Sequence, residues 1–398
     1  MFYIQELIKF VLNIFGNIVL GISYFIPKHK NVWVFGAWWG TKFLDNPKHL
    51  FLYVNKRHPH IKAIWLSRKR HVIASMREMG YEAYSIYSVK GCWYSLRCAV
   101  AVLSHFQVSD FTPLPIHQRT KLIQLTHGIP LKKIGYDDNL RGKRHPWLYK
   151  TKTALGRILE PTLRRSYDLA TCTSEEAKLK FSSVYKLSLD RIKITGYPRN
   201  DTMLTPPVNT SLQENIRGIY MPTFRGKVFS EFNLFEKYNF NINKLDKYLK
   251  QANISLYFKL HPANYPTADL VKLINSSDNI FLYHEEDIYD SLNQFDFLIT
   301  DYSSIFFDYL LLDKPIIFAP FDLKKYKKED REHYYAYKDI TPGPKAKNWD
   351  EVVDLIKESI ANPDKYKEER KKIRDKFHAY QDKNSCQRVY KEIVKVLN

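Results

Sequence analysis

A histidine follows one of the most apolar segments of this 398-residue chain. The run Leu122–Leu125 predicts a buried strand, and His127 and Gly128 come two and three residues after it. An imidazole at the carboxyl end of a strand suits general base catalysis near neutral pH, and a neighbouring glycine lets a substrate approach the backbone. The alternative is a hydrogen-bonded structural histidine. Lys132 either attracts an anionic ligand or belongs to a solvated surface.

Polar side chains that suit phosphate follow four predicted strands in the second half of the chain. Arginine and lysine supply positive charge, and serine hydroxyls with the free N–H groups of a helix start supply hydrogen-bond donors. Each residue alone also has a structural explanation, such as helix capping by aspartate and serine. Together, at neighbouring strand ends, they predict a phosphate-binding cradle. The residues are Arg225, Lys259, His261, Asp301, Ser303, Ser304 and Asp322.

A turn rich in glycine and proline, Thr195–Asp201, ends another predicted strand. Arg199 can bind phosphate oxygens through two N–H groups, and Asn200 or Asp201 can cap the following helix. A capped turn between two domains, without any ligand, explains this segment equally well.

Several kinds of site are not expected. The chain has neither GxGxxG nor GxxxxGK[ST], so dinucleotide and Walker-type nucleotide sites are not indicated. It has no HExxH motif, and we predict no metal site and no metal cofactor. The four cysteines lack CxxC spacing, which is typical of reduced, buried thiols in a cytosolic protein. They are Cys92, Cys98, Cys172 and Cys386.

Short apolar runs alternate with longer amphipathic segments along most of the chain. This order predicts an α/β fold with mostly parallel sheets, arranged as two Rossmann-like, doubly wound domains that face each other across a cleft. Ligands of such sheets bind beyond the carboxyl ends of the strands, where the residues above lie. We expect domains at 29–203 and 216–375, a linker at Leu204–Asn215 and a C-terminal helix at 376–398.

The first 28 residues form a segment of their own. Apolar residues from Ile4 to Ile26 recur with helical spacing, and Lys28 and Lys30 follow them. This pattern favours an amphipathic helix lying in the membrane interface near anionic headgroups. The uncharged run Phe10–Ile26 is also just long enough for a span. A third interpretation is a helix packed on the protein's own core.

The charge of the chain favours polyanionic partners, because 62 Lys and Arg against 42 Asp and Glu give +20. Eight of these cations lie in Leu140–Arg165 against the single Glu160. We predict that this segment holds anionic headgroups or a phosphate polymer, the alternative being a solvated helical face. Nucleic acid is not an expected partner, because the chain lacks the signatures of known nucleic-acid-binding folds.

The segments above, in order, resemble the CDP-glycerol glycerophosphotransferases of teichoic acid and capsule synthesis. The resemblance runs from about Val32 to Pro344. It rests on the motifs Thr126-His127-Gly128, Pro130–Gly135, Thr195–Asp201, Pro222-Thr223-Phe224-Arg225, Lys259-Leu260-His261-Pro262, Thr300–Ser304 with Phe307-Asp308, and Thr341–Pro344.

The resemblance implies a GT-B-like fold, with the acceptor on the N-terminal domain and a CDP-alditol on the C-terminal domain. An acceptor hydroxyl would attack the β-phosphorus of CDP-glycerol and CMP would leave, with His127 as the base. His261 would act beside it on the pyrophosphate. No cofactor is implied besides the donor substrate. The implied substrate-binding residues are Gly128, Lys132, Arg199, Asn200, Thr223, Arg225, Lys259, Asp301, Ser303 and Ser304.

The implied partners are CDP-glycerol, a lipid-linked or polymeric acceptor that carries phosphate, and an anionic membrane surface. The protein is therefore expected at the cytoplasmic face of the cell membrane, as a peripheral enzyme. Two other activities fit the same pattern: a CDP-ribitol ribitolphosphotransferase, and a GT-B glycosyltransferase that uses a nucleotide sugar. The second should not need both Thr126-His127-Gly128 and Asp301–Ser304.

Overall fold

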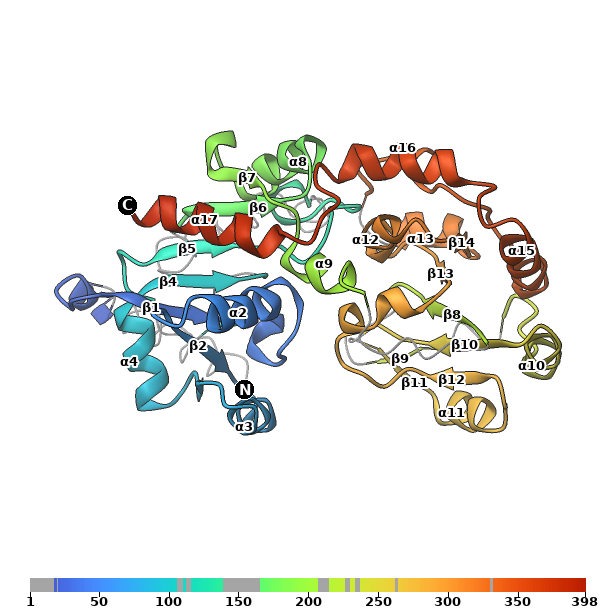
Figure 1. The fold of residues 1–398 in the computed structure, drawn as a ribbon, viewed down its shortest axis with the longest axis horizontal. Helices are drawn as coiled ribbons and strands as arrows, with labels where there is room; N and C mark the ends of the chain where they lie inside the picture. Colours follow the sequence, from blue (N-terminus) through green and yellow to red (C-terminus); the bar gives the residue numbers. More distant parts are fainter. Residues whose placement is uncertain are drawn as a thin grey trace. The chain divides into compact units, whose positions relative to one another are not determined.

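The computed structural model describes residues 18–19, 21–105, 110–111, 116–138, 165–206, 215–225, 230–232, 237–261, 264–329 and 332–398. The chain forms two compact units (Figure 1). The first comprises residues 1–127, 134–202 and 382–398, and the second comprises 128–133 and 203–381.

The first unit is built on a parallel sheet in the order β3-β2-β1-β4-β5-β6-β7. The chain starts in the middle, winds outward to β3 and then returns to the other side of β1. The strand order therefore reverses between β1 and β4, which is the topological switch point where doubly wound sheets bind ligands. The strands are β1 (His29–Phe35), β2 (Lys62–Ser67), β3 (Ala83–Ser85), β4 (Cys98–Leu103), β5 (Lys121–Gln124), β6 (Leu169–Cys172) and β7 (Ile192–Ile194).

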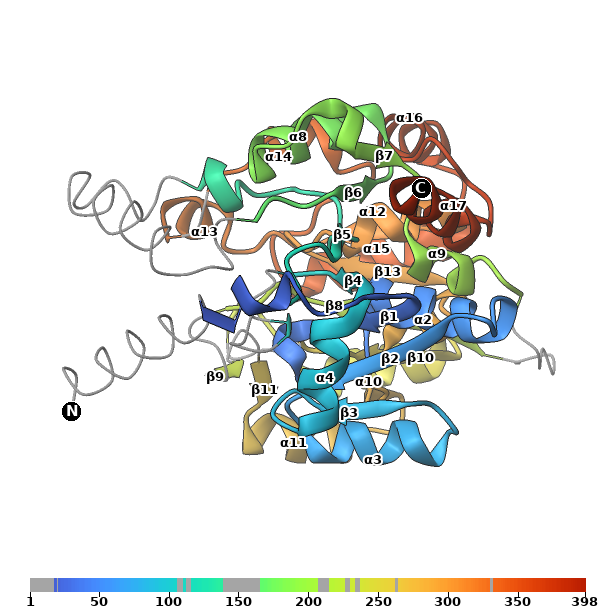
Figure 2. The same ribbon diagram turned by 90° about the vertical axis from the view of Figure 1, so that its left-hand side faces the viewer.

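Both faces of this sheet are apolar. Alternate residues of each strand point to opposite sides, and successive residues of its strands are apolar and buried. In β1, Trp33 and Phe35 join one core cluster, whereas Val32 and Val34 join the other. The helices that pack on the sheet, seen in Figures 1 and 2, include α17 along α2, β5 and β6. The helices are α2 (Asp45–Arg57), α3 (Arg70–Glu78), α4 (Val89–Arg97), α8 (Glu175–Tyr185), α9 (Pro198–Met203) and α17 (Ser385–Leu397).

The second unit repeats this arrangement with a parallel sheet in the order β12-β10-β8-β13-β14. Its order reverses between β8 and β13, so the second switch point lies there. The strands are β8 (Ile216–Met221), β10 (Ile254–Phe258), β12 (Ile280–Leu282), β13 (Phe297–Thr300) and β14 (Ile316–Phe318), with a separate parallel pair, β9 (Ser230–Phe232) and β11 (Asn264–Pro266).

Helices of the second unit cover its sheet and follow its strands. Several begin at a side-chain cap: Asn241 accepts from the backbone of Lys244, and Thr267 accepts from that of Leu270. The helices are α10 (Ile242–Gln251), α11 (Ala268–Asn275), α12 (Ile305–Tyr309), α13 (Leu323–Glu329), α14 (Tyr337–Ile340), α15 (Trp349–Ala361) and α16 (Lys367–Phe377).

The predicted α/β fold with parallel sheets is confirmed. Three short strands, β3, β9 and β11, were not predicted. Residues 305–312 form α12, followed by a 3₁₀ turn.

Two predicted segments fall largely outside the described residues. Residues 207–214 of the predicted linker lie outside them, as do residues 1–17 and 20 of the predicted membrane helix. Within the described part of the chain, no helix has the length and apolar character that a membrane crossing requires. The membrane helix therefore stays a prediction. The basic segment Leu140–Arg165 lies outside the described residues except for Arg165.

Candidate active site

A buried carboxylate joins two strand ends at the switch point of the first unit. Asp110 accepts hydrogen bonds from the backbone N–H groups of Trp39, beyond β1, and of Ser104 and His105, beyond β4, at 2.8, 3.1 and 2.6 Å. It is fully buried, and burial raises its pKa to about 7 against the opposing effect of these donors. Asp110 thus holds the two strand ends in a fixed relation.

His127 lies beside these residues, beyond β5. Its ring stacks on that of His105, with 4.6 Å between the ring centroids and 6° between the ring planes. Its Nδ1 lies 3.4 Å from the carbonyl oxygen of Ser104. Since a carbonyl can only accept, Nδ1 carries the proton in this contact and Nε2 is the basic nitrogen. Burial, and then the nearby His127, lower the pKa of His105 well below its ordinary value.

The backbone before His127 is held in an unusual conformation. Thr126 has a φ of 57°, a left-handed value that is rare for a β-branched residue. Its N–H donates to Gln124 Oε1 at 2.9 Å, and Asn46 Nδ2 donates to the carbonyls of Leu125 and Thr126 at 3.2 and 3.0 Å. These side chains stabilise the turn that presents His127. Gly128 follows with a φ of 150°.

Arg199, a predicted phosphate ligand, is buried in this first unit. Its Nη1 donates to Asp45 Oδ1 at 2.7 Å and to the carbonyl of His127 at 3.0 Å. Only 5% of its side chain is exposed. The structure thus places Arg199 behind the His127 turn, as a positioning group, and its predicted contact with substrate stays a prediction.

Asn200 and Asp201 lie within α9, and Asn200 is buried. The prediction that Asn200 or Asp201 caps the following helix is wrong for Asp201. Its two carboxylate oxygens accept from the backbone N–H groups of Ser385 and Cys386 at 2.8 and 2.7 Å. Asp201 therefore supports the start of α17, a helix far along the chain, and sequence distance concealed this partner.

In the second unit, Asp301 occupies the switch point between β8 and β13. Its Oδ1 accepts from the backbone N–H and the hydroxyl of Thr223 at 2.8 and 2.5 Å, and from the N–H of Tyr302 at 2.5 Å. It is completely buried. Asp301 therefore orders the loop after β8 instead of capping α12, and its predicted contact with substrate stays a prediction.

The guanidinium of Arg225 sits between two carboxylates. Its Nη2 donates to Asp301 Oδ2 at 2.7 Å, and its Nε donates to Asp322 Oδ2 at 3.0 Å. Burial opposes the charge, but Asp301 and then Asp322 outweigh it and raise the pKa of Arg225 above its ordinary value. The guanidinium also lies over the rings of Tyr302 and Tyr326. Because it neutralises both carboxylates, the pair is not free to bind a metal ion.

Lys132 and Lys259 add positive charge to this unit. Lys132 Nζ donates to the hydroxyl of Tyr326 and lies 4.6 Å from the centre of that ring, which stacks on Tyr302. Lys132 and Arg225 therefore contact the same side chain, that of Tyr326. Lys259 Nζ donates to the carbonyl of Glu285 at 2.6 Å.

The remaining predicted phosphate ligands follow β10 and β13. The ring of His261 lies 5.7 Å from that of Phe224, in the loop after β8. Ser303 Oγ lies 3.5 Å from the backbone N–H of Ile305, and Ser304 precedes α12 without a side-chain cap. Ser303 therefore accepts a long hydrogen bond from the first N–H group of α12, whereas the side chain of Ser304 does not cap this helix.

Sequence reasoning missed four positioning residues: Asp45, Asn46, His105 and Asp110. His105 follows a predicted strand as His127 does, so its position was a usable signal. Asn264 was missed as well. Its side chain accepts from the N–H of Arg225 at 3.0 Å and donates to the carbonyl of the same residue at 2.9 Å. No local sequence pattern predicts these two bonds, because the two residues are far apart in the chain.

The fold and the site define a class of protein. The chain has two parallel, doubly wound sheets. One carries a basic histidine nitrogen, and the other carries arginine, lysine and hydroxyl groups at its switch point. This combination is typical of GT-B-like transferases that use nucleotide-activated donors.

Comparison with known proteins identifies the family. The model of the family CDP-Glycerol:Poly(glycerophosphate) glycerophosphotransferase matches residues 18–395. The chain is 29% identical to a teichoic acid glycerol-phosphate transferase of Staphylococcus aureus over 92% of this chain and 94% of that protein. It is 25% identical to a teichoic acid poly(glycerol phosphate) polymerase of Bacillus subtilis over 89% of this chain, and it spans about half, 47%, of that relative.

A solved structure of the wall teichoic acid polymerase TagF has the same fold. It superposes with a TM-score of 0.76 at 22% identity, covering 99% of this chain and 97% of that one. The chain therefore belongs to the CDP-glycerol:poly(glycerophosphate) glycerophosphotransferase family. This confirms the family predicted from the motifs, and with it the class of enzyme.

Proposed function

We propose that this protein transfers phosphoglycerol from CDP-glycerol to a hydroxyl group of a lipid-linked or polymeric acceptor in teichoic acid or capsule synthesis, releasing CMP. The observation that carries the proposal is the family match over residues 18–395. The geometry of His127 supports it, because the contact of Nδ1 with the carbonyl of Ser104 favours the tautomer in which Nε2 is the proton acceptor.

In this reaction the acceptor hydroxyl donates a hydrogen bond to His127 Nε2 and its oxygen attacks the β-phosphorus. A bond forms between that oxygen and phosphorus, the bond from phosphorus to the CMP oxygen breaks, and the hydroxyl proton passes to His127. Phosphoryl-type transfers proceed through loose transition states, so the main contribution of His127 is to orient the hydroxyl. His127→Ala should lower turnover by roughly 10²- to 10⁴-fold.

The second unit would bind the donor. We assign the pyrophosphate to Ser303, Ser304 and His261, with Lys132 and Lys259 adding positive charge. Support comes from the position of these groups beyond β10 and β13, next to the switch point, and from the side chain of Ser304, which does not cap α12. Arg225 orders the loop after β8 through its ion pairs with Asp301 and Asp322. A contact between Arg225 and phosphate is part of the proposal.

We further propose peripheral attachment to an anionic membrane surface at the cytoplasmic face. Support comes from the described end of the N-terminal segment, where Ile22, Tyr24 and Phe25 are exposed. The Arg119 guanidinium lies 3.9 Å from the centre of the Tyr24 ring, and Lys28 donates to the carbonyl of Arg119. Exposed aromatic side chains next to cations are typical of membrane interfaces.

The test is CMP release by the purified protein in detergent, with crude membrane lipid as the acceptor source. CDP-glycerol, CDP-ribitol and a panel of UDP- and CMP-sugars serve as donors. The proposal predicts acceptor-dependent CMP release from CDP-glycerol. Turnover of CDP-ribitol alone would reassign the donor, and turnover of a nucleotide sugar alone would show that the motifs mark only a shared fold.

A further inference from the structure

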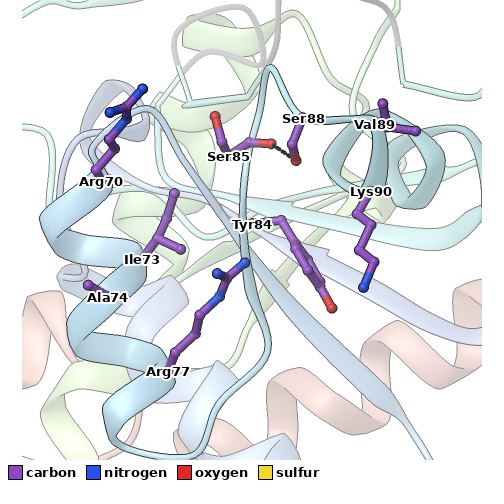
Figure 3. A pocket seen from close by; sticks show the side chains of 9 residues that line it. All are labelled: Arg70, Ile73, Ala74, Arg77, Tyr84, Ser85, Ser88, Val89 and Lys90. Carbon is purple, nitrogen blue, oxygen red and sulfur yellow. Dashed lines mark hydrogen bonds between the residues drawn. The ribbon is translucent and has the colours of Figure 1, made fainter.

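An open cavity of about 530 Å³ lies in the first unit, between α3, β3 and α4 (Figure 3). We propose that this cavity binds a phosphodiester segment of the acceptor polymer, several repeats away from the hydroxyl that reacts at His127. The inference rests on the proposed function. The residues that carry it are Arg70, Arg77, Tyr84, Ser85, Ser88 and Lys90.

The lining of the cavity is positively charged without compensation. It includes Arg70, Arg77 and Lys90 and no carboxylate. Among the described residues, none of these three cations forms an ion pair. The nearby Glu82 is already engaged, because it pairs with Lys62 at 2.8 Å. A ligand that lowers the energy of this cavity must therefore bring negative charge.

Two of the cations flank one aromatic ring. The guanidinium of Arg77 and the ammonium of Lys90 lie 5.2 and 5.6 Å from the centre of the Tyr84 ring. Figure 3 shows both side chains directed toward Tyr84, from α3 and α4. Each cation is therefore stabilised by the face of the ring, and a phosphodiester bound along the edge of the ring would be attracted by both.

Part of the cavity lining lies at the same edge of the sheet as His127. Ser85 is the last residue of β3, and Ser88 caps α4 by accepting from Gly91 N–H at 3.1 Å. Because the strands are parallel, the carboxyl ends of β3 and β5 lie on one edge, and His127 follows β5.

Polar and aromatic groups line the path between the cavity and the histidines. Arg68 donates to the hydroxyl of Tyr87 at 2.7 Å and to the carbonyl of Trp39 at 3.1 Å. The Trp39 ring lies 5.2 Å from the ring of His105, which stacks on His127. Tyr87 and Trp39 are exposed, so a chain bound in the cavity can pass along this edge toward His127.

The spacing of the strands determines how long a polymer must be to reach both the cavity and His127. Four inter-strand steps separate β3 from β5, which at about 4.8 Å each is about 19 Å. A glycerol phosphate repeat has twice the backbone bonds of an amino-acid residue and so spans about 7 Å when extended. An acceptor therefore needs about three repeats to occupy the cavity while its end lies at His127.

The test compares full-length variants in binding to synthetic glycerol phosphate oligomers, by calorimetry and without CDP-glycerol. Arg70→Ala/Lys90→Ala removes two cations that make no hydrogen bond among the described residues. The matched control, Arg191→Ala/Lys193→Ala, removes two cations from the start of β7, the opposite edge strand.

We expect the cavity variant to bind oligomers well above three repeats roughly tenfold more weakly than the wild type, since exposed contacts contribute up to about 1 kcal/mol each. The slope of log Kd against log salt should fall by about 1.4, and oligomers below three repeats should bind unchanged. In turnover, KM for long acceptors should rise while kcat stays the same.

Equal binding of long oligomers by the cavity variant and the wild type would overturn the proposal. So would an equal loss in the control, which would indicate only the field of the whole protein, or a loss confined to phosphatidylglycerol vesicles, which would assign the cavity to lipid. Cavity-dependent binding of oligomers by a protein that releases no CMP would contradict the proposed function while supporting the cavity.

Discussion

The buried ion pair between Asp45 and Arg199 should hold the catalytic turn. The side chains are 4% and 5% exposed, and the donor–acceptor distance is 2.7 Å. Asp45→Asn leaves the guanidinium buried without a counter-charge, so we expect a loss of about 3 to 5 kcal/mol in the free energy of unfolding. Arg199→Met should cost a similar amount. The double variant has no buried charge at this place and should cost much less than the sum, giving a coupling energy of at least about 3 kcal/mol.

The assay is urea unfolding followed by the fluorescence of Trp33 and Trp65, which lie in the core of the first unit. Because Arg199 also donates to the carbonyl of His127, the single variants should lower kcat and leave KM for CDP-glycerol unchanged. Additive losses of stability in the double variant would refute the coupling. A raised KM for the donor with normal kcat would instead assign Arg199 to substrate binding.

Three further outcomes follow from buried groups. The raised pKa of Asp110, about 7, favours its protonated form in the native state, so its contribution to stability is lost as pH rises from about 4 to 7. The lowered pKa of His105 acts in the opposite direction, because below pH 6.5 the unfolded chain binds a proton at His105 that the native state does not. In Asp110→Asn only the effect of His105 remains, so the free energy of unfolding should rise with pH below 6.5 by up to about 1.4 kcal/mol per pH unit. Urea midpoints at several pH values measure this slope, and a flat profile would contradict the reasoning. Arg225→Ala should destabilise the second unit by about 3 kcal/mol, and Asp322→Asn in the same chain should recover part of this in thermal unfolding; no recovery would show that the carboxylates do not repel. Gly218→Ala should lower stability by about 1 to 3 kcal/mol in the same measurement, because its Cβ would meet a core ring at 2.1 Å, and an unchanged melting temperature would refute the close packing.

The sequence was sufficient for those features that depend on local pattern. Strands such as β4 and β13 are continuous apolar runs, and polar residues follow them directly, so both the sheets and the strand-end residues could be predicted. The family motifs then placed His127 and Asp301 at these ends.

Features that depend on distant partners could not be predicted. The sequence marks Arg199 as a cation in a turn, and only the fold brings Asp45 close enough to bury it. Likewise, residues 382–398 belong to the first unit, where the carboxylate of Asp201 accepts hydrogen bonds from the first N–H groups of α17. Capping of α12, the structural alternative for Asp301, does not occur for the same reason: Thr223 and Arg225, which follow β8, donate to its oxygens.

The protein is proposed to join glycerol phosphate to an acceptor with His127 as the base. The most direct measurement follows radiolabelled glycerol from CDP-glycerol into lipid-linked polymer, with the wild type and a folded His127→Ala variant side by side. We predict acceptor-dependent incorporation matched by CMP release in the wild type, and incorporation lowered by roughly 10²- to 10⁴-fold in the variant. Equal incorporation by both proteins would contradict the role of His127, and CMP release without incorporation would contradict the transfer itself.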